Sequence, residues 1–145
     1  MKKIPLSVEH FAGNLRAIAH FLLRSEDPHL FIPIMAIVDT GSPLTLIGPL
    51  DLKKMRLSKI QIQKIEGKLN PINVGGGEVS TKILEKTKLK FSNTNVEIEM
   101  PVHFPLRGEE NPTQPSLLGV DFMLKTKAKL YFNPSRKEAY FEIED

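Results

Sequence analysis

The sequence of 145 residues contains no cysteine and no tryptophan. Without cysteine there can be no disulfide framework, no thiol nucleophile and no thiolate ligand for a metal. Cysteine peptidase chemistry is therefore excluded. The spacing of the four histidines does not match that of metal ligands, so we expect no metal site and no cofactor; they are His10, His20, His29 and His103.

Long apolar runs are missing as well. No uncharged stretch approaches the roughly 20 apolar residues that a membrane helix requires. The N-terminus begins with Met1, Lys2 and Lys3, but Glu9 and Arg16 interrupt the next residues, so the apolar region of a signal peptide is absent. We expect a soluble, cytoplasmic protein that does not associate with membranes.

Neither sign of charge is in large excess, since 20 Lys and Arg residues against 17 Asp and Glu residues leave a net charge of +3. An excess of this size does not imply a polyanionic partner. Four lysines alternate along one predicted strand: Lys82, Lys86, Lys88 and Lys90. Lysines on an edge strand commonly prevent unwanted strand pairing, so we do not expect nucleic acid to be the partner.

Proline and glycine, in contrast, are frequent, with 11 and 9 residues spread through the chain. They divide it into short apolar segments, which is typical of a β-rich protein with many turns. With 41% hydrophobic and 26% charged residues, the chain can bury a core of its own. We therefore expect a mostly β protein that forms a single domain over residues 1–145.

Two apolar runs, residues 15–23 and 30–38, predict a β-hairpin with its turn at residues 24–29. The first run also fits a helical period of about 3.6, so a helix stays open there as an alternative. Pro33 lacks a donor for the strand ladder and should lie at an edge or a bulge.

Later segments predict a helical turn, a glycine-rich hairpin, two strands, a short helix and a final hairpin. In the first of the two strands, Ile83, Glu85, Thr87, Leu89 and Phe91 are expected to share one face. The helical turn is predicted at 49–55 and the glycine-rich hairpin at 72–81. The two strands are predicted at 83–91 and 96–103, the short helix at 120–124 and the final hairpin at 128–143.

We expect the catalytic chemistry at Asp39, which directly follows the apolar run 30–38. A carboxylate at the floor of a cleft must be held by hydrogen bonds, and the adjoining turn offers backbone amides and hydroxyls without bulk. Gly41 lets the backbone approach the carboxylate closely, and Ser42 can donate to it. The supporting residues are thus Thr40, Gly41 and Ser42.

The mechanism in which carboxylates activate a water needs two of them, which share one proton. A single carboxylate is therefore insufficient. The chain has one such motif, and a symmetric homodimer would supply the second Asp39 across a two-fold axis. Asp51 and Asp121 are expected to be structural, Asp51 in a helical turn and Asp121 as a hydrogen-bond acceptor.

These motifs resemble those of the retropepsin-like aspartic peptidases, over roughly residues 30–132. Three features occur in the family's order: residues 37–42 as the catalytic loop, the glycine-rich hairpin 72–81 as the flap, and residues 117–119 as the apolar-apolar-glycine motif. The resemblance implies an acid protease fold, with a closed, β-barrel-like protomer, a short C-terminal helix and a symmetric homodimer.

By the same resemblance, Asp39 is the catalytic residue of an aspartic endopeptidase, and Thr40 clasps its counterpart across the dimer. The flap residues that close over a peptide or protein substrate are Val74, Gly75, Gly76 and Gly77. The second motif is Leu117, Leu118 and Gly119. Val120 stands where retroviral enzymes usually carry arginine, so the viral pattern of ion pairs is not carried over. The alternative is a catalytically inactive module that keeps the fold to bind peptides or to mediate assembly.

Overall fold

The computed structural model describes residues 2–27, 29–56, 58, 70–74, 77–105 and 114–144. In these residues nine strands join in one sheet, with two short α-helices and a 3-10 turn. The elements are β1 (Lys2–Phe11), β2 (Asn14–Glu26), β3 (His29–Val38), α1 (Pro49–Met55), β4 (Asn70–Val74), β5 (Gly77–Phe91), β6 (Glu97–Pro105), β7 (Ser116–Leu118), α3 (Val120–Thr126), β8 (Lys129–Asn133), η1 (Pro134–Arg136) and β9 (Glu138–Ile143).

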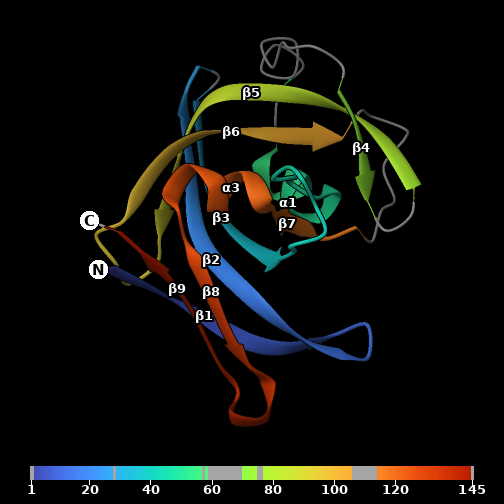
Figure 1. Cartoon of the computed structure of the whole chain (residues 1–145). Coiled ribbons are helices and arrows are strands. Elements are labelled where there is room, and N and C mark those ends of the chain that lie inside the picture. The colour runs from blue at the N-terminus through green and yellow to red at the C-terminus, as the bar shows by residue number, and fades with distance from the viewer. Residues whose placement is uncertain are drawn as a thin grey trace.

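The sheet runs in the order β4-β5-β2-β1-β9-β8, while β3 pairs with β2, and β6 pairs with β5. These pairs are antiparallel, and the pairing of β3 with β7 is parallel. Long strands twist, and here the sheet curls into a half-barrel around α1 and α3 (Figure 1). The mostly β fold with a short C-terminal helix is therefore as expected.

Most predicted elements are present. The run 15–23 lies in the strand β2, so the helical alternative is wrong. Pro33 lies in a part of β3 that, among the described residues, pairs only with β2, at an edge as its missing donor requires. Helix α1 has Pro49 in its first turn, where no intrahelical donor is needed.

The prediction of which residues share one face of β5 is wrong. The register of β5 against β6 shifts between Leu84 and Thr87, and this irregularity interrupts the alternation of side chains. As a result Leu84 is buried, although it was expected opposite the core face, and Glu85 is exposed.

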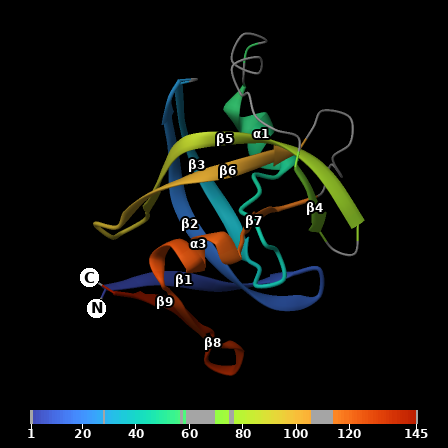
Figure 2. The same cartoon turned by 45° about the horizontal axis from the view of Figure 1, so that its top comes forward.

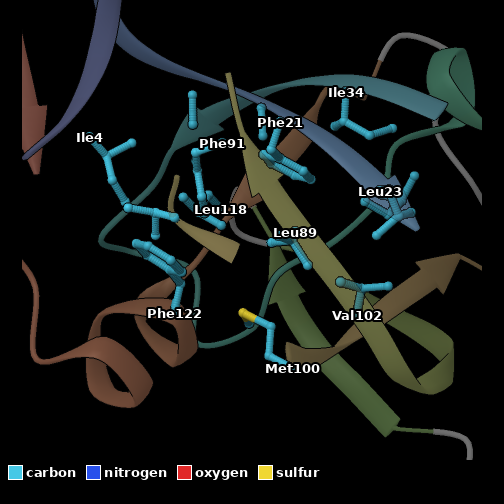
Figure 3. Packing of buried hydrophobic residues seen from close by; sticks show 14 of the residues in the cluster. Ile4, Phe21, Leu23, Ile34, Leu89, Phe91, Met100, Val102, Leu118 and Phe122 are labelled. Atoms are coloured by element: carbon cyan, nitrogen blue, oxygen red, sulfur yellow. The ribbon is translucent and has the colours of Figure 1, made fainter. Parts of the chain in front are cut away.

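Four phenylalanines connect α3 to both halves of the sheet. Phe21 and Phe91 are directly opposite each other on β2 and β5, with ring centroids 5.6 Å apart. Phe122 of α3 is fully buried, 5.2 Å from Phe91 and 5.1 Å from Phe141. Figure 3 shows Phe91 and Phe122 in this core together with Leu118 of β7. Aromatic burial on this scale fixes α3 against the sheet.

The first and last strands close the molecule at one end. Residues 2–6 of β1 pair with β9, and residues 7–11 pair with β2, so the two chain ends lie side by side (Figures 1 and 2). The N-terminal segment, which precedes the motifs of the family resemblance, is thus an integral part of the sheet. Within the described ranges, no helix is both long and apolar enough to span a bilayer.

Candidate active site

Asp39 directly follows β3, at the point where this strand lies parallel to β7. Val38 is paired with Leu118, and the backbone N–H of Asp39 donates to the carbonyl oxygen of Leu118 at 3.0 Å. Val38 and Leu118 are both apolar, and each is buried or half-buried. The strand pair therefore forms a rigid base for the turn at residues 39–42. The structure thus brings together the two motifs that the sequence separates by about eighty residues.

The carboxylate of Asp39 is half-buried and tied to its own turn. Its Oδ1 accepts a hydrogen bond from the N–H of Gly41 at 2.9 Å. A Cβ atom at Gly41 would lie 3.2 Å from this same oxygen, which is a tight contact. The backbone at Gly41 therefore approaches the carboxylate of Asp39 closely, as expected. Thr40 is exposed, beside the carboxylate in sequence.

The expected role of Ser42 is wrong. Its buried hydroxyl donates to the carbonyl oxygen of Leu44 at 2.7 Å, and a hydroxyl has one proton to donate. Its backbone, in contrast, does hold the loop, because the N–H donates to the Asp39 carbonyl at 3.1 Å and the carbonyl accepts from Val120 at 2.8 Å. Ser42 therefore supports the turn and not the carboxylate.

A polar cluster behind the loop, which sequence reasoning missed, centres on the fully buried Thr45. The Thr45 hydroxyl donates to Asp121 Oδ1 at 2.7 Å and accepts from the N–H of Gly119 at 3.1 Å. The N–H of Thr45 donates to Asp121 Oδ2 at 2.8 Å, and the N–H of Phe122 donates to Oδ1 at 2.8 Å. Asp121 is therefore the structural acceptor that was expected.

Gly119 has no room for a side chain. A Cβ atom there would lie 2.5 Å from the carbonyl oxygen of Leu44 and 2.8 Å from that of Ser42. These are backbone atoms of the loop that carries Asp39, so they cannot move aside cheaply. The glycine of the second motif is needed because the active-site loop packs directly against it.

Asp51 fixes the other end of β7. Its Oδ2 accepts from the Ser116 hydroxyl at 2.5 Å, and Ser116 Oγ accepts in turn from the N–H of Gly48 at 2.8 Å. The half-exposed Lys54 lies 3.1 Å from Asp51 Oδ1. This carboxylate, buried on α1, is a structural group as expected, and it joins α1 to β7.

His103 is the buried histidine of β6, and its backbone bonds to the segment after the Asp39 loop. Its N–H donates to the Thr45 carbonyl and its carbonyl accepts from Ile47, both at 2.9 Å. Burial lowers the pKa of His103 below 6.5, and the charge of Asp121 opposes this shift. The imidazole is therefore preferentially neutral in the folded protein.

The predicted flap is described in part. Strands β4 and β5 form an antiparallel hairpin in which Val74 pairs with Gly77. Gly75 and Gly76 lie outside the described residues.

The lysine row faces acidic neighbours on the adjacent strand. Lys88 is paired with Glu99 and Lys90 with Glu97, and the register shift in β5 further divides the row. Paired carboxylates cancel much of the field that a polyanion would need, so this surface gives no support to nucleic-acid binding.

A pocket of about 550 Å³ lies at the opposite end of β3 from Asp39. Its lining includes Arg24, Ser25, His29, Phe31, Lys86 and Glu99. Asp39 is not among the residues that line this pocket. Among the described residues no group of three or more His, Cys, Asp or Glu side chains could hold a metal ion.

No protein-family model matches the chain, and no curated protein matches its sequence. Several solved structures are similar to it, and two of them are described here. A retropepsin-like aspartic protease from Rickettsia conorii is 14% identical, with a TM-score of 0.54 over 97% of this chain and 89% of that chain. EIAV protease, solved with a bound inhibitor, is 15% identical, with a TM-score of 0.48 over 86% of this chain and 100% of that chain. The protein has the retropepsin-like fold, as its motifs predicted, and identities this low establish the fold alone.

Proposed function

We propose that the protein is one protomer of a homodimeric aspartic endopeptidase. The observation that carries this proposal is the setting of Asp39: a half-buried carboxylate, held by the Gly41 amide on a turn fixed by β7 and Gly119. This setting is well suited to half of a pair.

In the dimer the two Asp39 carboxylates face each other across the two-fold axis and share one proton, because two adjacent negative charges repel. The ionised carboxylate takes a proton from a water as its oxygen attacks the peptide carbonyl carbon. The protonated carboxyl group gives its proton to the carbonyl oxygen. The tetrahedral intermediate then collapses, a proton passes to the amide nitrogen, and the carbon–nitrogen bond breaks.

Other residues have proposed roles that follow from their position. Thr40, exposed beside Asp39, clasps the same residue of the partner. The hairpin that contains Val74 and Gly77, assigned to the flap by the family resemblance together with Gly75 and Gly76, closes over an extended peptide. The substrate would add a strand beneath the hairpin, so that main-chain bonds give affinity and side-chain pockets give specificity.

A hydrogen bond from Ser42 would favour the ionised carboxylate and thus activity at acidic or mildly acidic pH. Since Ser42 donates to Leu44, that argument does not apply. The shared proton of the pair is the remaining reason to expect an acidic optimum.

The test is cleavage of a mixed peptide library from pH 3 to 8 by the wild type, Asp39→Asn and a matched control, Asp27→Asn, at an exposed carboxylate. The dimer fraction is recorded on the same samples. We expect cleavage by the wild type and the control only. A dimeric wild type that cleaves nothing would overturn the proposal and favour a module that only binds peptides.

A further inference from the structure

The cavity of about 550 Å³ at the far end of β3 lies where the β2–β3 hairpin separates from β5. Arg24 is the last residue of β2 that pairs with β5, opposite Lys88, and the register shift in β5 ends directly before Lys88. Ser25 and Glu26 pair with β3 alone, so the tip of the hairpin extends past β5 (Figures 1 and 2). The gap has the size of sites that take small molecules, about 300–1,000 Å³.

The two buried residues of the lining are Ser25 and Leu30, which are directly opposite each other on β2 and β3. Ser25 is 8% exposed, and among the described residues its hydroxyl is the one buried side-chain group without a hydrogen-bond partner. The buried hydroxyl of Thr87 on β5, in contrast, donates to the carbonyl of Met100. Buried polar groups without a partner are costly and rare in native proteins, so Ser25 indicates a ligand that bonds to it.

The exposed part of the lining carries charges of both signs, and several of them already have a neighbour of opposite sign. Arg24 Nη1 lies 3.0 Å from Glu97 Oε2, outside the cavity. Lys88 is directly opposite Glu99 on β6. These residues form a rim around the cavity whose charges are largely balanced.

Glu26 and Lys86 are the charged residues of the lining that stand apart. If the pairing of β2 with β5 continued past Arg24, these two residues would be directly opposite each other. Because the strands separate, neither forms a salt bridge within the part of the chain that the structure describes. Asp27, the remaining acid of the lining, takes part in an interaction of its own. A carboxylate and an ammonium group therefore remain on the two sides of the gap.

Two further features identify the kind of ligand. Phe31 lies at the rim, directly opposite Arg24, and its side chain is 62% exposed, so it offers a large apolar contact surface. The edge of β2 that faces β5 has no strand partner beyond Arg24 among the described residues, and an extended peptide can bond to such an edge through its main chain. Peptide groups, two opposite charges and an apolar side chain occur together in a short peptide with free ends.

We propose that this cavity is a second binding site, remote from Asp39, for a short extended peptide with both termini free and an apolar side chain. The peptide carboxylate binds to Lys86 and Ser25, and its ammonium group binds to Glu26. The Ser25 hydroxyl is covered by its surroundings and turns toward the peptide by a change of its χ1 rotamer. Since Asp39 is not part of the lining, the inference goes beyond the proposed function and does not depend on it.

The probe is the unblocked tripeptide Gly-Phe-Gly, titrated into the full-length Asp39→Asn protein by isothermal titration calorimetry, so that cleavage cannot interfere. We expect a dissociation constant below about 1 mM. Acetylation of the amino end and amidation of the carboxyl end should each weaken binding at least about threefold, because each removes one charged contact. Free phenylalanine has both charges and the ring but no peptide group, and it should also bind at least about threefold more weakly.

A pair of variants made in the same protein assigns the binding to this cavity. Lys86→Met and the control Lys125→Met each remove one exposed lysine, and Lys125 lies on α3, outside the lining. Lys86→Met should weaken the binding of Gly-Phe-Gly at least about threefold and leave the binding of the amidated peptide unchanged. Lys125→Met should change neither.

Ser25→Ala separates a binding role from a structural one. Because the hydroxyl has no partner among the described residues, its removal should leave the urea unfolding midpoint of the protein without peptide unchanged or higher. The same variant should weaken the binding of Gly-Phe-Gly about threefold or more. A clear fall of the midpoint would show that the hydroxyl stabilises the fold, and it would overturn the role assigned to Ser25.

The inference is overturned if Gly-Phe-Gly shows no binding up to about 1 mM, if the blocked peptides or free phenylalanine bind equally well, or if Lys86→Met binds the tripeptide as tightly as Lys125→Met. These results leave the proposed function standing whenever cleavage by the wild type depends on Asp39. Conversely, a protein that binds the tripeptide through Lys86 but cleaves nothing supports this site and overturns the peptidase.

Discussion

Replacing Thr45 by valine removes one hydroxyl from the polar cluster behind Asp39 and leaves the shape of the side chain nearly unchanged. Two hydrogen bonds disappear: the one donated to Asp121 Oδ1 at 2.7 Å and the one accepted from the N–H of Gly119 at 3.1 Å. Asp121 keeps the hydrogen bonds that the backbone N–H groups of Thr45 and Phe122 donate to it. The buried N–H of Gly119, however, loses the acceptor that it has in this cluster.

The magnitude can be worked out from these two losses. A hydrogen bond to a charged group contributes about 1.5–3 kcal/mol, and a buried donor without a partner costs about 1–3 kcal/mol. The added methyl group offsets part of this, so we expect the free energy of unfolding to fall by about 2–4 kcal/mol. With a urea m-value of about 2 kcal/mol/M, the unfolding midpoint should fall by about 1–2 M.

The assay is urea unfolding at one fixed protomer concentration, because the apparent stability of a dimer depends on concentration. Thr126→Val is the matched control: its hydroxyl donates to the carbonyl of Phe122, one turn earlier in α3, and such bonds contribute little. We expect the control to change stability by less than about 1 kcal/mol. Equal midpoints for the two variants would refute the idea that Thr45 joins the Asp39 loop to α3.

Two further substitutions test the account. Gly119→Ala should destabilise the fold by at least about 2 kcal/mol, because its Cβ would lie 2.5 Å from the Leu44 carbonyl oxygen while the backbone φ of −93° is open to alanine; an unchanged melting temperature would contradict this packing. His103 has its pKa lowered by burial, so the unfolded chain binds a proton that the native state does not, and stability should fall as pH decreases below about 6.5. The urea midpoint of His103→Gln should then fall less than that of the wild type between pH 7.5 and pH 5.5, and an equal fall would show that another group titrates.

The parts of the site that depend on neighbouring residues could be predicted from sequence. An apolar run that ends at Asp39, next to Thr40 and Gly41, specifies a strand and a turn, because each residue suits its own local conformation. The Gly41 amide and the tight space at its Cα are as expected. The place of Pro33 at a strand edge results from its missing donor in the same way.

Two errors have local causes that the sequence does not reveal. A serine hydroxyl has several acceptors within reach, and the turn happens to present the carbonyl of Leu44 to Ser42. The register shift between Leu84 and Thr87 depends on how β5 pairs with β6. Over a few residues the alternation of lysine and leucine is compatible with the register before the shift and with the register after it. Backbone irregularities of this kind are set by the whole sheet.

Contacts between distant segments were missed altogether. Thr45 and Asp121 are 76 residues apart, and neither lies in a motif that indicates the other. The pairing of β1 with β9 is also invisible in the sequence, because any two alternating strands could form it. The polar cluster around Thr45 and the pairing of β1 with β9 therefore became apparent only from the folded arrangement.

Subunit mixing tests the central claim, that one active site is made from Asp39 of two copies. Wild type and Asp39→Asn are combined in equal amounts, allowed to exchange protomers, and assayed at the total concentration of the wild-type reference. If two Asp39 residues are required, only the dimers with two wild-type protomers are active, and the activity should be about a quarter of the reference. An activity of about half would show that each protomer works alone, and it would contradict the shared site.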